Sequence, residues 1–299
     1  MRSKRFPAYG SRLALVGLLL ACLLIGACGR KQKPIIVGSK NSTDQMILGE
    51  IIAQHLETRL GRPIQRRLGV GNTMVTYQTM QSDQINVYPE FTGTMITEIL
   101  REQPATDAAL VFERARGEMR RVGQIEVLDP LGFSAEPVGV IASADPRAAK
   151  TSNLSEAAGA SPGWKIAVSF DFQQRLDGVP AITQYHLPMT DPVRAVEAAE
   201  LYRSIEQGQV SMVFGTMTDG QLALSKWKAL RDDKSLFTPQ QACILVRKTS
   251  IDAEPNLQPV LSELSGRIST EAMQRMNAEV IGNQRPIADV AKEFLARKK

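Results

Sequence analysis

The chain has 299 residues, which suits one large domain or two moderate ones, and its 43% hydrophobic content is enough to bury a core. Charged residues make up 22%, so the chain as a whole does not belong to the disordered class. Four of the 36 basic residues and none of the 31 acidic ones precede residue 28, which leaves 32 basic against 31 acidic residues and a net charge of +1. This balance argues against a nucleic-acid-binding protein, and 2 His and 3 Cys argue against a structural zinc site.

The N-terminus has the pattern of an exported protein. Basic residues between Arg2 and Arg12 precede an unbroken apolar run from Leu13 to Ala27. The run is short for a membrane span and is typical of a secretory signal peptide. It ends in LLIGAC, which resembles the bacterial lipoprotein signal and implies cleavage before Cys28 and lipidation of that cysteine. The alternative is an ordinary signal peptide, or an N-terminal anchor helix, in which Cys28 is incidental.

Strands and helices alternate along the rest of the chain, which predicts an α/β fold. The apolar runs predict strands over 34–38, 64–70, 85–91, 138–143, 165–170, 210–215, 227–232 and 241–248. The amphipathic stretches predict helices over 43–60, 73–84, 92–102, 106–122, 191–209 (with Asp191 as its cap), 255–266, 269–282 and 286–298.

One internal similarity suggests two lobes built from related units. YQTMQSDQINVY, which begins at Tyr77, resembles YRSIEQGQVSMVF, which begins at Tyr202, and in both a helix end leads into a strand. Coincidence between two amphipathic helices is the alternative.

Signatures of catalysis are nearly absent. The chain has no dinucleotide-binding glycine motif, P-loop, HExxH, GxSxG or EF-hand loop, and we expect neither a metal nor a cofactor. Ser225 to Lys228 fit S-x-x-K, which leaves a secreted serine enzyme using Ser225 and Lys228 as an alternative, although the companion motifs are missing. His55 and His186 are each predicted to be structural.

Four loops at the carboxyl ends of predicted strands carry the candidate binding site. They span 38–45, 69–73, 88–94 and 215–220, and they are rich in Ser, Thr, Asn and Gly. Ligands of open α/β sheets bind at this edge, and backbone amides at helix starts suit a carboxylate. Any one loop alone would be interpreted as caps and turns, but the four together predict a site for a small polar ligand.

Long motifs run through these loops in a fixed order. VGSKNSTDQMILG, RRLGVGNT and INVYPEFTGT are followed by LGF, RLDGVPAIT, TDG and DDKSLFTPQQA. Together they resemble the substrate-binding proteins of ABC importers for glycine betaine, choline and related osmoprotectants. The resemblance implies a two-lobed periplasmic-binding-protein fold, type II-like, with hinge crossover strands and a ligand held between the lobes. It also implies an ABC permease and its ATPase subunits as partners, and no enzymatic activity.

The resemblance also implies how the chain divides into segments and lobes, and which residues bind the ligand. It implies a signal peptide over 1–27, a lipidated tether over 28–33, a first lobe over 34–134 plus 241–299 and a second lobe over 135–240. The expected ligand-binding residues are Ser39, Asn41, Gln45, Asn72, Thr73, Tyr88, Phe91, Thr92, Phe170, Thr218 and Asp219. The hydroxyl and amide groups would bind the polar end of the ligand, the Tyr88 and Phe91 rings its cationic or apolar body, and Asp219 would be a counter-charge.

The aromatic cage that the family uses for quaternary ammonium groups is thinned in this chain. Phe91 stands where the family has tyrosine, and Pro137, Thr216 and Gln241 stand at or near expected aromatic positions. Fewer ring faces offset the desolvation of a quaternary ammonium poorly. We expect an exported, membrane-anchored solute-binding component of an ABC importer that binds glycine betaine weakly. A binding protein for an unrelated polar solute, and a receptor-like or permease-fused sensing domain, are the alternatives.

The lipoprotein signal predicts that Cys28→Ser releases the protein from membranes or blocks its processing, because no sulfur remains to carry the acyl chain. Membrane fractionation and the mass of the mature chain measure this. Cys22→Ser is the control, since Leu20 precedes that cysteine where a small residue is wanted. A Cys28→Ser protein that stays membrane-bound and is cleaved normally contradicts the prediction.

Overall fold

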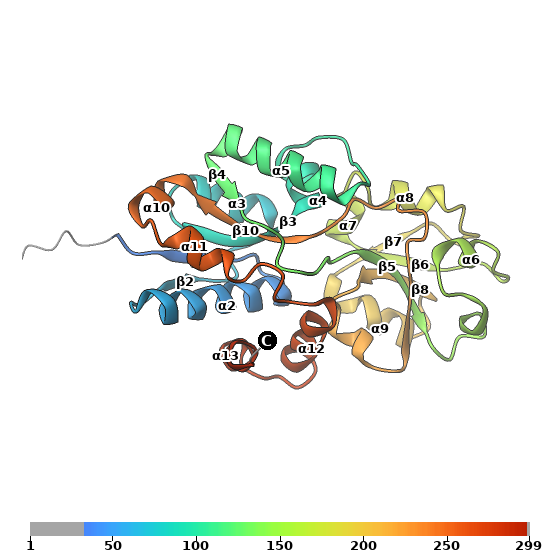
Figure 1. Cartoon of the computed structure of the whole chain (residues 1–299). Coiled ribbons are helices and arrows are strands. Elements are labelled where there is room, and N and C mark those ends of the chain that lie inside the picture. The colour runs from blue at the N-terminus through green and yellow to red at the C-terminus, as the bar shows by residue number, and fades with distance from the viewer. Residues whose placement is uncertain (1–32, 298–299) are drawn as a thin grey trace, which may run out of the picture. The chain divides into compact units, whose positions relative to one another are not determined.

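Two five-stranded mixed sheets carry the fold of residues 33–297, the part of the chain that the computed structural model describes (Figure 1). The first sheet has the order β2-β1-β3-β10-β4 and the second β7-β6-β8-β5-β9. We call each sheet with its helices the first and the second lobe. The strands of the first are β1 (Ile36–Gly38), β2 (Gln65–Arg67), β3 (Val87–Phe91), β4 (Ile125–Val127) and β10 (Ala242–Arg247). Those of the second are β5 (Pro137–Ala142), β6 (Ile166–Ser169), β7 (Arg194–Val196), β8 (Met212–Thr216) and β9 (Trp227–Leu230).

Helices cover both sheets. The first lobe has α2 (Thr43–Leu60), α3 (Thr73–Gln81), α4 (Thr92–Thr94), the π-helix η1 (Met95–Ile99), α5 (Ala108–Gly123), α10 (Lys248–Ala253), α11 (Leu257–Ser262), α12 (Thr270–Ile281) and α13 (Ile287–Ala296). The second lobe has α6 (Leu154–Ala158), α7 (Phe170–Gln174), α8 (Val179–Gln184), α9 (Leu201–Glu206) and the 3-10 turns η2 (Ala148–Lys150), η3 (Ala198–Glu200) and η4 (Gly220–Ala223). Over residues 33–297 no helix combines the length and the apolarity that a membrane crossing requires.

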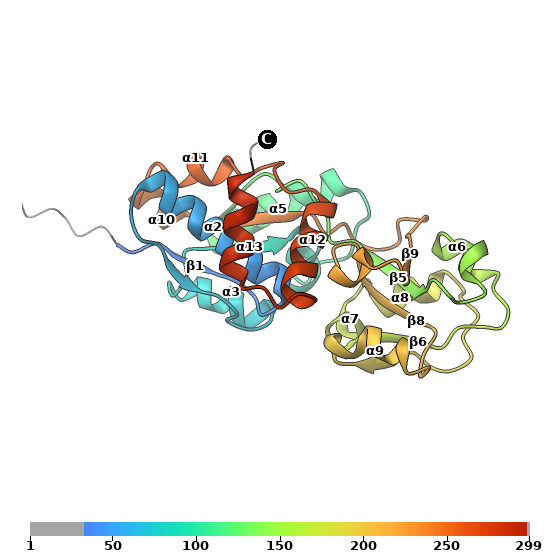
Figure 2. The ribbon, with the colours of Figure 1, turned by 90° about the horizontal axis from the view of Figure 1, so that it is seen from below.

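The first lobe is organised around α2. The helix ends at Gly61, whose φ of 63° is the left-handed conformation that glycine adopts without strain. Its apolar residues, Ile47, Leu48, Ile51 and Leu56 among them, are fully buried against the sheet and the C-terminal helices. Figures 1 and 2 show α12 and α13, in red, beside α2, in blue. The sheet and these helices thus share one core.

The two lobes exchange strands. Strand β10 follows the second lobe and pairs antiparallel with β3 and β4, whereas β5 follows the first lobe and pairs antiparallel with β8 and β9. The two connecting segments also bond to each other, because Ala135 N–H donates to the Gln240 carbonyl at 2.9 Å and Ala242 N–H to the Phe133 carbonyl at 3.1 Å. This arrangement confirms the expected α/β fold with crossover strands. The exact division at 134/135 and 240/241 stays a prediction.

The internal similarity falls on equivalent elements. Tyr77 lies in α3, which leads into β3, and Tyr202 lies in α9, which leads into β8. Each of these strands is the third in its sheet.

Three local expectations need correction or lie outside the described residues. The predicted helix over 191–209 is wrong. Residues 194–196 form β7, which pairs with the otherwise open edge of β6. The α-helix in this stretch covers only 201–206, and Asp191 does not cap it. A sheet edge that needs hydrogen-bond partners overrides helix propensity here.

The strand predicted over 165–170 ends one residue early, because the Ser169 hydroxyl accepts from Phe172 N–H and caps α7. The signal peptide, and Cys28 with all of its tether except Lys33, lie outside the described residues.

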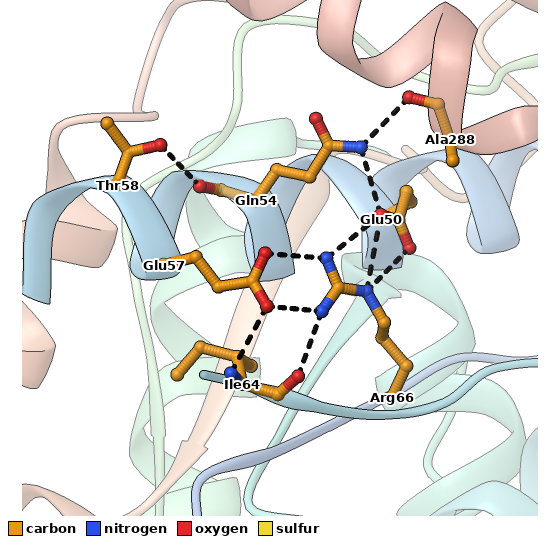
Figure 3. Close-up of polar contacts among 7 residues, drawn as sticks. All are labelled: Glu50, Gln54, Glu57, Thr58, Ile64, Arg66 and Ala288. Carbon is orange, nitrogen blue, oxygen red and sulfur yellow. Dashed lines mark hydrogen bonds and ion pairs between the residues drawn. The ribbon is translucent and has the colours of Figure 1, made fainter. Parts of the chain in front are cut away.

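Arg66 fastens the edge strand β2 to α2 (Figure 3). Its guanidinium makes three hydrogen bonds to the Glu50 carboxylate, at 3.0–3.2 Å, and two to the Glu57 carboxylate, at 2.6 and 2.8 Å. Gln54 extends the network to α13 by donating to Glu50 and to the Ala288 carbonyl, both at 2.9 Å. The Glu50 side chain is only 8% exposed, so its charge depends on this partner.

We expect Arg66→Ala to lower the free energy of unfolding by about 2–4 kcal/mol, because it leaves the Glu50 carboxylate buried and unpaired. Urea unfolding followed by circular dichroism measures the change. Arg121→Ala is the matched control: Arg121 is 70% exposed and pairs with Glu118 on the surface, and its loss should leave stability nearly unchanged. Equal effects of the two substitutions would contradict the role assigned to Arg66.

Candidate functional site

A cavity of about 710 Å³ lies between the two sheets, at the carboxyl ends of their parallel strands. The loops that follow β1 and β2, the end of β3 and the π-helix η1 line it from the first lobe. Helix α7 with the residues that flank it, and Thr216 at the end of β8, line it from the second lobe. Ala135 and Gln240 contribute from the crossover segments, so the cavity touches the hinge as well as both lobes.

Four of the residues expected from the sequence line this cavity: Asn41, Asn72, Thr73 and Phe91. Asn72 also caps α3, because its side-chain oxygen accepts from Val75 N–H at 3.1 Å. The turn that carries Asn41 is held to the loop after β2 by a hydrogen bond from Asn41 N–H to the Gly71 carbonyl at 3.0 Å. These residues therefore lie at or next to the starts of helices α2, α3 and α4.

Most of the other expected residues lie behind the cavity walls. Ser39, Gln45, Tyr88, Thr92 and Thr218 are almost completely buried. The Ser39 hydroxyl accepts from Gly69 N–H at 3.0 Å, and the Thr92 hydroxyl donates to the Pro239 carbonyl at 3.0 Å, so both fix the backbone that shapes the site. Within the described residues the Gln45 amide and the Tyr88 hydroxyl have no hydrogen-bond partner.

Phe170 is the outlying member of the expected set. It is 46% exposed in the first turn of α7 and is absent from the cavity lining, whereas Phe172, two residues on, lines it. The ligand-binding roles of all eleven residues stay predictions.

Asp219 is held by its own lobe. One carboxylate oxygen accepts from the Thr216 hydroxyl at 2.8 Å, and the other accepts from the Tyr202 hydroxyl at 2.8 Å and from Thr216 N–H at 3.2 Å. Burial raises the pKa of Asp219 above its ordinary value, and the hydrogen bonds from Thr216 and Tyr202 oppose that rise. Asp219 thereby positions Thr216, which lines the cavity.

Lys40 and Glu90 form an ion pair at the first lobe's wall. The Lys40 Nζ lies 2.5 Å from Glu90 Oε1 and 5.3 Å from the centroid of the Phe91 ring. The Glu90 side chain is fully buried, and Oε1 also accepts from Phe91 N–H at 2.9 Å. Burial raises the pKa of Glu90, against the opposing effect of the Lys40 charge.

Arg175 and Asp177 form the corresponding pair on the second lobe. The guanidinium and carboxylate meet at 2.8 Å, and the Arg175 Cζ lies 6.0 Å from the centroid of Phe172. Asp177 also accepts from Thr238 N–H at 2.9 Å, which ties α7 to the crossover segment. Burial opposes ionisation of Asp177, but the Arg175 charge and these hydrogen bonds outweigh it and hold the pKa below its ordinary value.

Of the described residues that line the cavity, Phe91 and Phe172 are the aromatic ones. Phe172 stacks on Phe214 with centroids 5.7 Å apart and contacts Phe237 at 5.9 Å, so it is anchored in the core. Phe91 meets Phe133 edge-on at 6.4 Å. Tyrosine does not occur among these lining residues. The thinned cage stays a prediction.

The lobes also meet away from the cavity. Asn277 in α12 donates to the Thr218 carbonyl at 2.8 Å, and Gln274 donates to the Met217 carbonyl at 3.2 Å. Gly220 lies so close to α12 that a Cβ there would stand 2.5 Å from the Ala278 nitrogen. The loop after β8 is therefore fixed to helix α12 of the first lobe.

Sequence reasoning missed the charged residues of the cavity. Lys40, Glu98, Arg101, Asp171 and Arg175 line it beside Asp44. Lys40 and Arg175 lie inside motifs already singled out, GSKN and RLDGVP, so a signal was present for both. Across residues 33–297 there is no cluster of three or more His, Cys, Asp or Glu suited to hold a metal ion.

Known proteins match almost the whole described chain. A family model, OpuAC, the substrate binding domain of ABC-type glycine betaine transport systems, matches residues 33–297. The ergothioneine transport permease/ergothioneine binding protein EgtU of Helicobacter pylori is 28% identical over 97% of the chain, which spans about half (52%) of that relative. The glycine-betaine-binding protein of Pseudomonas aeruginosa is 28% identical over 93% of the chain and 92% of its own length.

A solved structure has the same fold. The crystal structure of a glycine betaine/carnitine/choline ABC transporter superimposes with a TM-score of 0.77 over 87% of this chain and 97% of that one, at 22% identity. The two-lobed binding-protein fold expected from the sequence is thereby confirmed.

We expect Asp177→Asn to lower stability at pH 7 by about 1–3 kcal/mol, because Arg175 loses its buried counter-ion. A carboxylate whose pKa is lowered by folding stabilises above its unfolded pKa of about 4 and loses that contribution as pH falls. The difference from the unmodified protein should therefore shrink below about pH 4. Urea unfolding from pH 7 to pH 3 measures it.

The control is Asp191→Asn, since Asp191 is 57% exposed and 3.8 Å from Lys165. A stability difference for Asp177→Asn that is the same at pH 7 and pH 3 would contradict the role assigned to the ionised carboxylate.

Proposed function

The chain belongs to the OpuAC family of substrate-binding domains of ABC-type glycine betaine transport systems, and from this premise we propose that it captures a small zwitterionic osmoprotectant between its lobes. The bound solute would then pass to an ABC permease driven by its ATPase subunits. The observation that carries the proposal is the charge pattern of the cavity, which places both signs of charge beside two aromatic rings.

A zwitterion fits this pattern better than a simple cation. Lys40 and Arg175 enter the cavity wall with their charges partly neutralised by Glu90 and Asp177, and Arg101 adds a further cation. Asp44, Glu98 and Asp171 supply the opposite sign. A ligand with a carboxylate at one end and a cationic group at the other can satisfy both sets at once.

The names of the relatives indicate the same class. Glycine betaine, carnitine and ergothioneine each combine a quaternary ammonium group with a carboxylate, whereas choline lacks the carboxylate. The Phe91 and Phe172 rings would pack against the methylated end, and hydroxyl and amide groups such as those of Asn41, Asn72 and Thr73 would bind the polar end. With two rings in place of a fuller cage, we propose weak binding of glycine betaine.

The family assignment excludes the enzyme alternative: the chain belongs to a family of substrate-binding domains and is not an enzyme. The local geometry agrees: the Lys228 Nζ donates to the Ala148 carbonyl at 2.6 Å, and Ser225 is not among the residues that line the cavity. A lipid anchor at Cys28 on the outer side of a membrane remains part of the proposal and is supported by the LLIGAC motif.

The test is a thermal-shift screen with glycine betaine, choline, carnitine, proline betaine, ectoine and ergothioneine, followed by calorimetry. We expect at least one zwitterion to stabilise the protein, since a ligand at 100 times its dissociation constant adds about 2.7 kcal/mol. Glycine betaine should bind with a dissociation constant on the order of 0.1 mM or weaker. Thr216→Tyr adds a ring at the cavity wall and should tighten glycine betaine binding, whereas Ser225→Ala should leave it unchanged.

Failure of every compound to stabilise the protein would contradict the proposed ligand class. Micromolar glycine betaine binding by the unmodified protein would contradict the thinned cage and leave the transport role in place.

A further inference from the structure

Helix α12 of the first lobe touches the second lobe outside the cavity, through polar groups that are buried. Asn277 is only 5% exposed and donates to the Thr218 carbonyl at 2.8 Å. A second bond runs from Gln274 to the Met217 carbonyl at 3.2 Å. Gly220 packs so closely on the backbone of α12 that a Cβ there would clash with it. These five residues form what we call the α12 contact.

The α12 contact lies beside the hinge. Just before α12, Ile268 N–H donates to the Leu131 carbonyl at 2.9 Å. Just after β8, Met217 N–H donates to the Glu136 carbonyl at 2.9 Å. Both sides of the contact are therefore bonded to the same crossover segment, close to the line about which the lobes would turn. Displacement in a rotation grows with distance from its axis, so a contact placed here can persist while the far edge of the cleft moves.

That far edge lies on the opposite faces of both sheets. In the first lobe, α12 packs with α2 on one face of the sheet, whereas η1 packs with α3 and α5 on the other. In the second lobe, α9 and the loop after β8 pack on one face and α7 on the other. Figure 1 shows α12 and α9 on one side of strands β5 and β10, and α4 and α7 on the other. Of the described residues that line the cavity, several come from η1 and α7 and none from α12.

We propose that the α12 contact is a third element of the hinge, so that the second lobe turns about a line through the crossover segments and this contact, and the cleft opens only between η1 and α7. The proposal rests on the proposed function, because it says how the cleft admits the solute that the lobes capture. Opening on the α12 side would leave the buried Asn277 amide and the Thr218 carbonyl without each other, which is unfavourable. The TDG motif thereby gains a role, since its glycine, Gly220, is the residue that lets the backbones meet.

Distances between pairs of spin labels, measured by pulsed electron paramagnetic resonance, test this geometry. Leu224→Cys with Ile281→Cys forms the contact pair, which reports across the α12 contact from two positions that are about half exposed. Gln103→Cys with Gln173→Cys forms the edge pair, which reports between the segment after η1 and α7 from two exposed positions. All four side chains lie outside the cavity lining, so the labels leave the proposed binding residues in place.

The ligand-free protein should give a narrow distance distribution for the contact pair and a broader one for the edge pair. Glycine betaine at about 10 mM, 100 times the expected dissociation constant, should shorten the edge distance by more than about 2 Å and change the contact distance by less than about 1 Å. Ergothioneine is the second probe. The mature chain with Cys28→Ser carries the labels, since Cys243 is fully buried and is not labelled.

Gly220→Ala disturbs the third hinge element itself. The added Cβ would meet the α12 backbone, and Gly220 is not in the left-handed region, so the substitution acts through the contact alone. The contact pair should broaden, and calorimetry should show glycine betaine binding about threefold more weakly, because a smaller fraction of the protein holds the arrangement that closes. Gly117→Ala in α5 is the matched control: a Cβ there has nothing within 4 Å, and neither measurement should change. Gln274→Ala, which removes one bond of the contact, carries the test if Gly220→Ala does not fold.

A contact pair as broad as the edge pair, or one that shifts as far with glycine betaine, would overturn the proposal, because α12 would then part from the second lobe during opening. An edge pair that is narrow without ligand and unmoved by both probes would overturn it as well. Failure of the proposed function is a different result, in which no screened zwitterion binds although the edge pair is broad and the contact pair narrow.

Discussion

The exchange of strands between the lobes is the constraint on which the cavity depends. Because β5 and β10 each complete the sheet that the chain has just entered, the two connecting segments run side by side and bond to each other near Ala135 and Gln240. Both residues line the cavity, so the hinge is also its floor. Thr92 reinforces the junction, because its hydroxyl donates to the Pro239 carbonyl and accepts from Gln241 N–H at 3.1 Å. Rotation about these segments would change the cavity without unpairing either sheet.

Buried carboxylates organise the walls around that floor. Glu90 in β3, Asp177 after α7 and Glu50 in α2 are each at most 8% exposed, and each is held by one basic side chain. Such pairs contribute little net stability, but removing one partner is costly, so they fix geometry more than they add free energy. Two of the three hold their basic partner beside an aromatic ring of the cavity, which makes the rings of Phe91 and Phe172 part of charged assemblies rather than free apolar surfaces.

Much of the fold could be predicted from the sequence, and less of the site. Apolar runs located most strands. Because parallel strands end at one edge, the four loops at 38–45, 69–73, 88–94 and 215–220 were expected to form a common site, and each contributes to the lining of the cavity. Phe170 was expected in the site as an aromatic residue at the end of a predicted strand. Helix α7 begins at that residue instead, and Phe170 is left exposed while Phe172 is buried.

Local sequence patterns could not predict which charged residues form ion pairs. Lys40 and Glu90 are 50 residues apart, and nothing near Lys40 in the sequence indicates which carboxylate it meets. The edge strand β7 was missed for the same reason, since its partner β6 lies more than twenty residues earlier in the chain.

The order in which the lobes can fold follows from the same exchange of strands. Every pairing in the second sheet joins residues between 137 and 230, a continuous stretch, whereas β3 must wait for β10, whose residues 242–247 come about 150 positions later. Contacts between distant residues form slowly because a long loop must close first. We expect the second lobe to fold first during synthesis while β3 stays an open edge, the kind of surface that pairs with other chains. Until β10 arrives, the open edge of β3 is thus a greater aggregation hazard than the short outer strands β4 and β9 of the finished sheets.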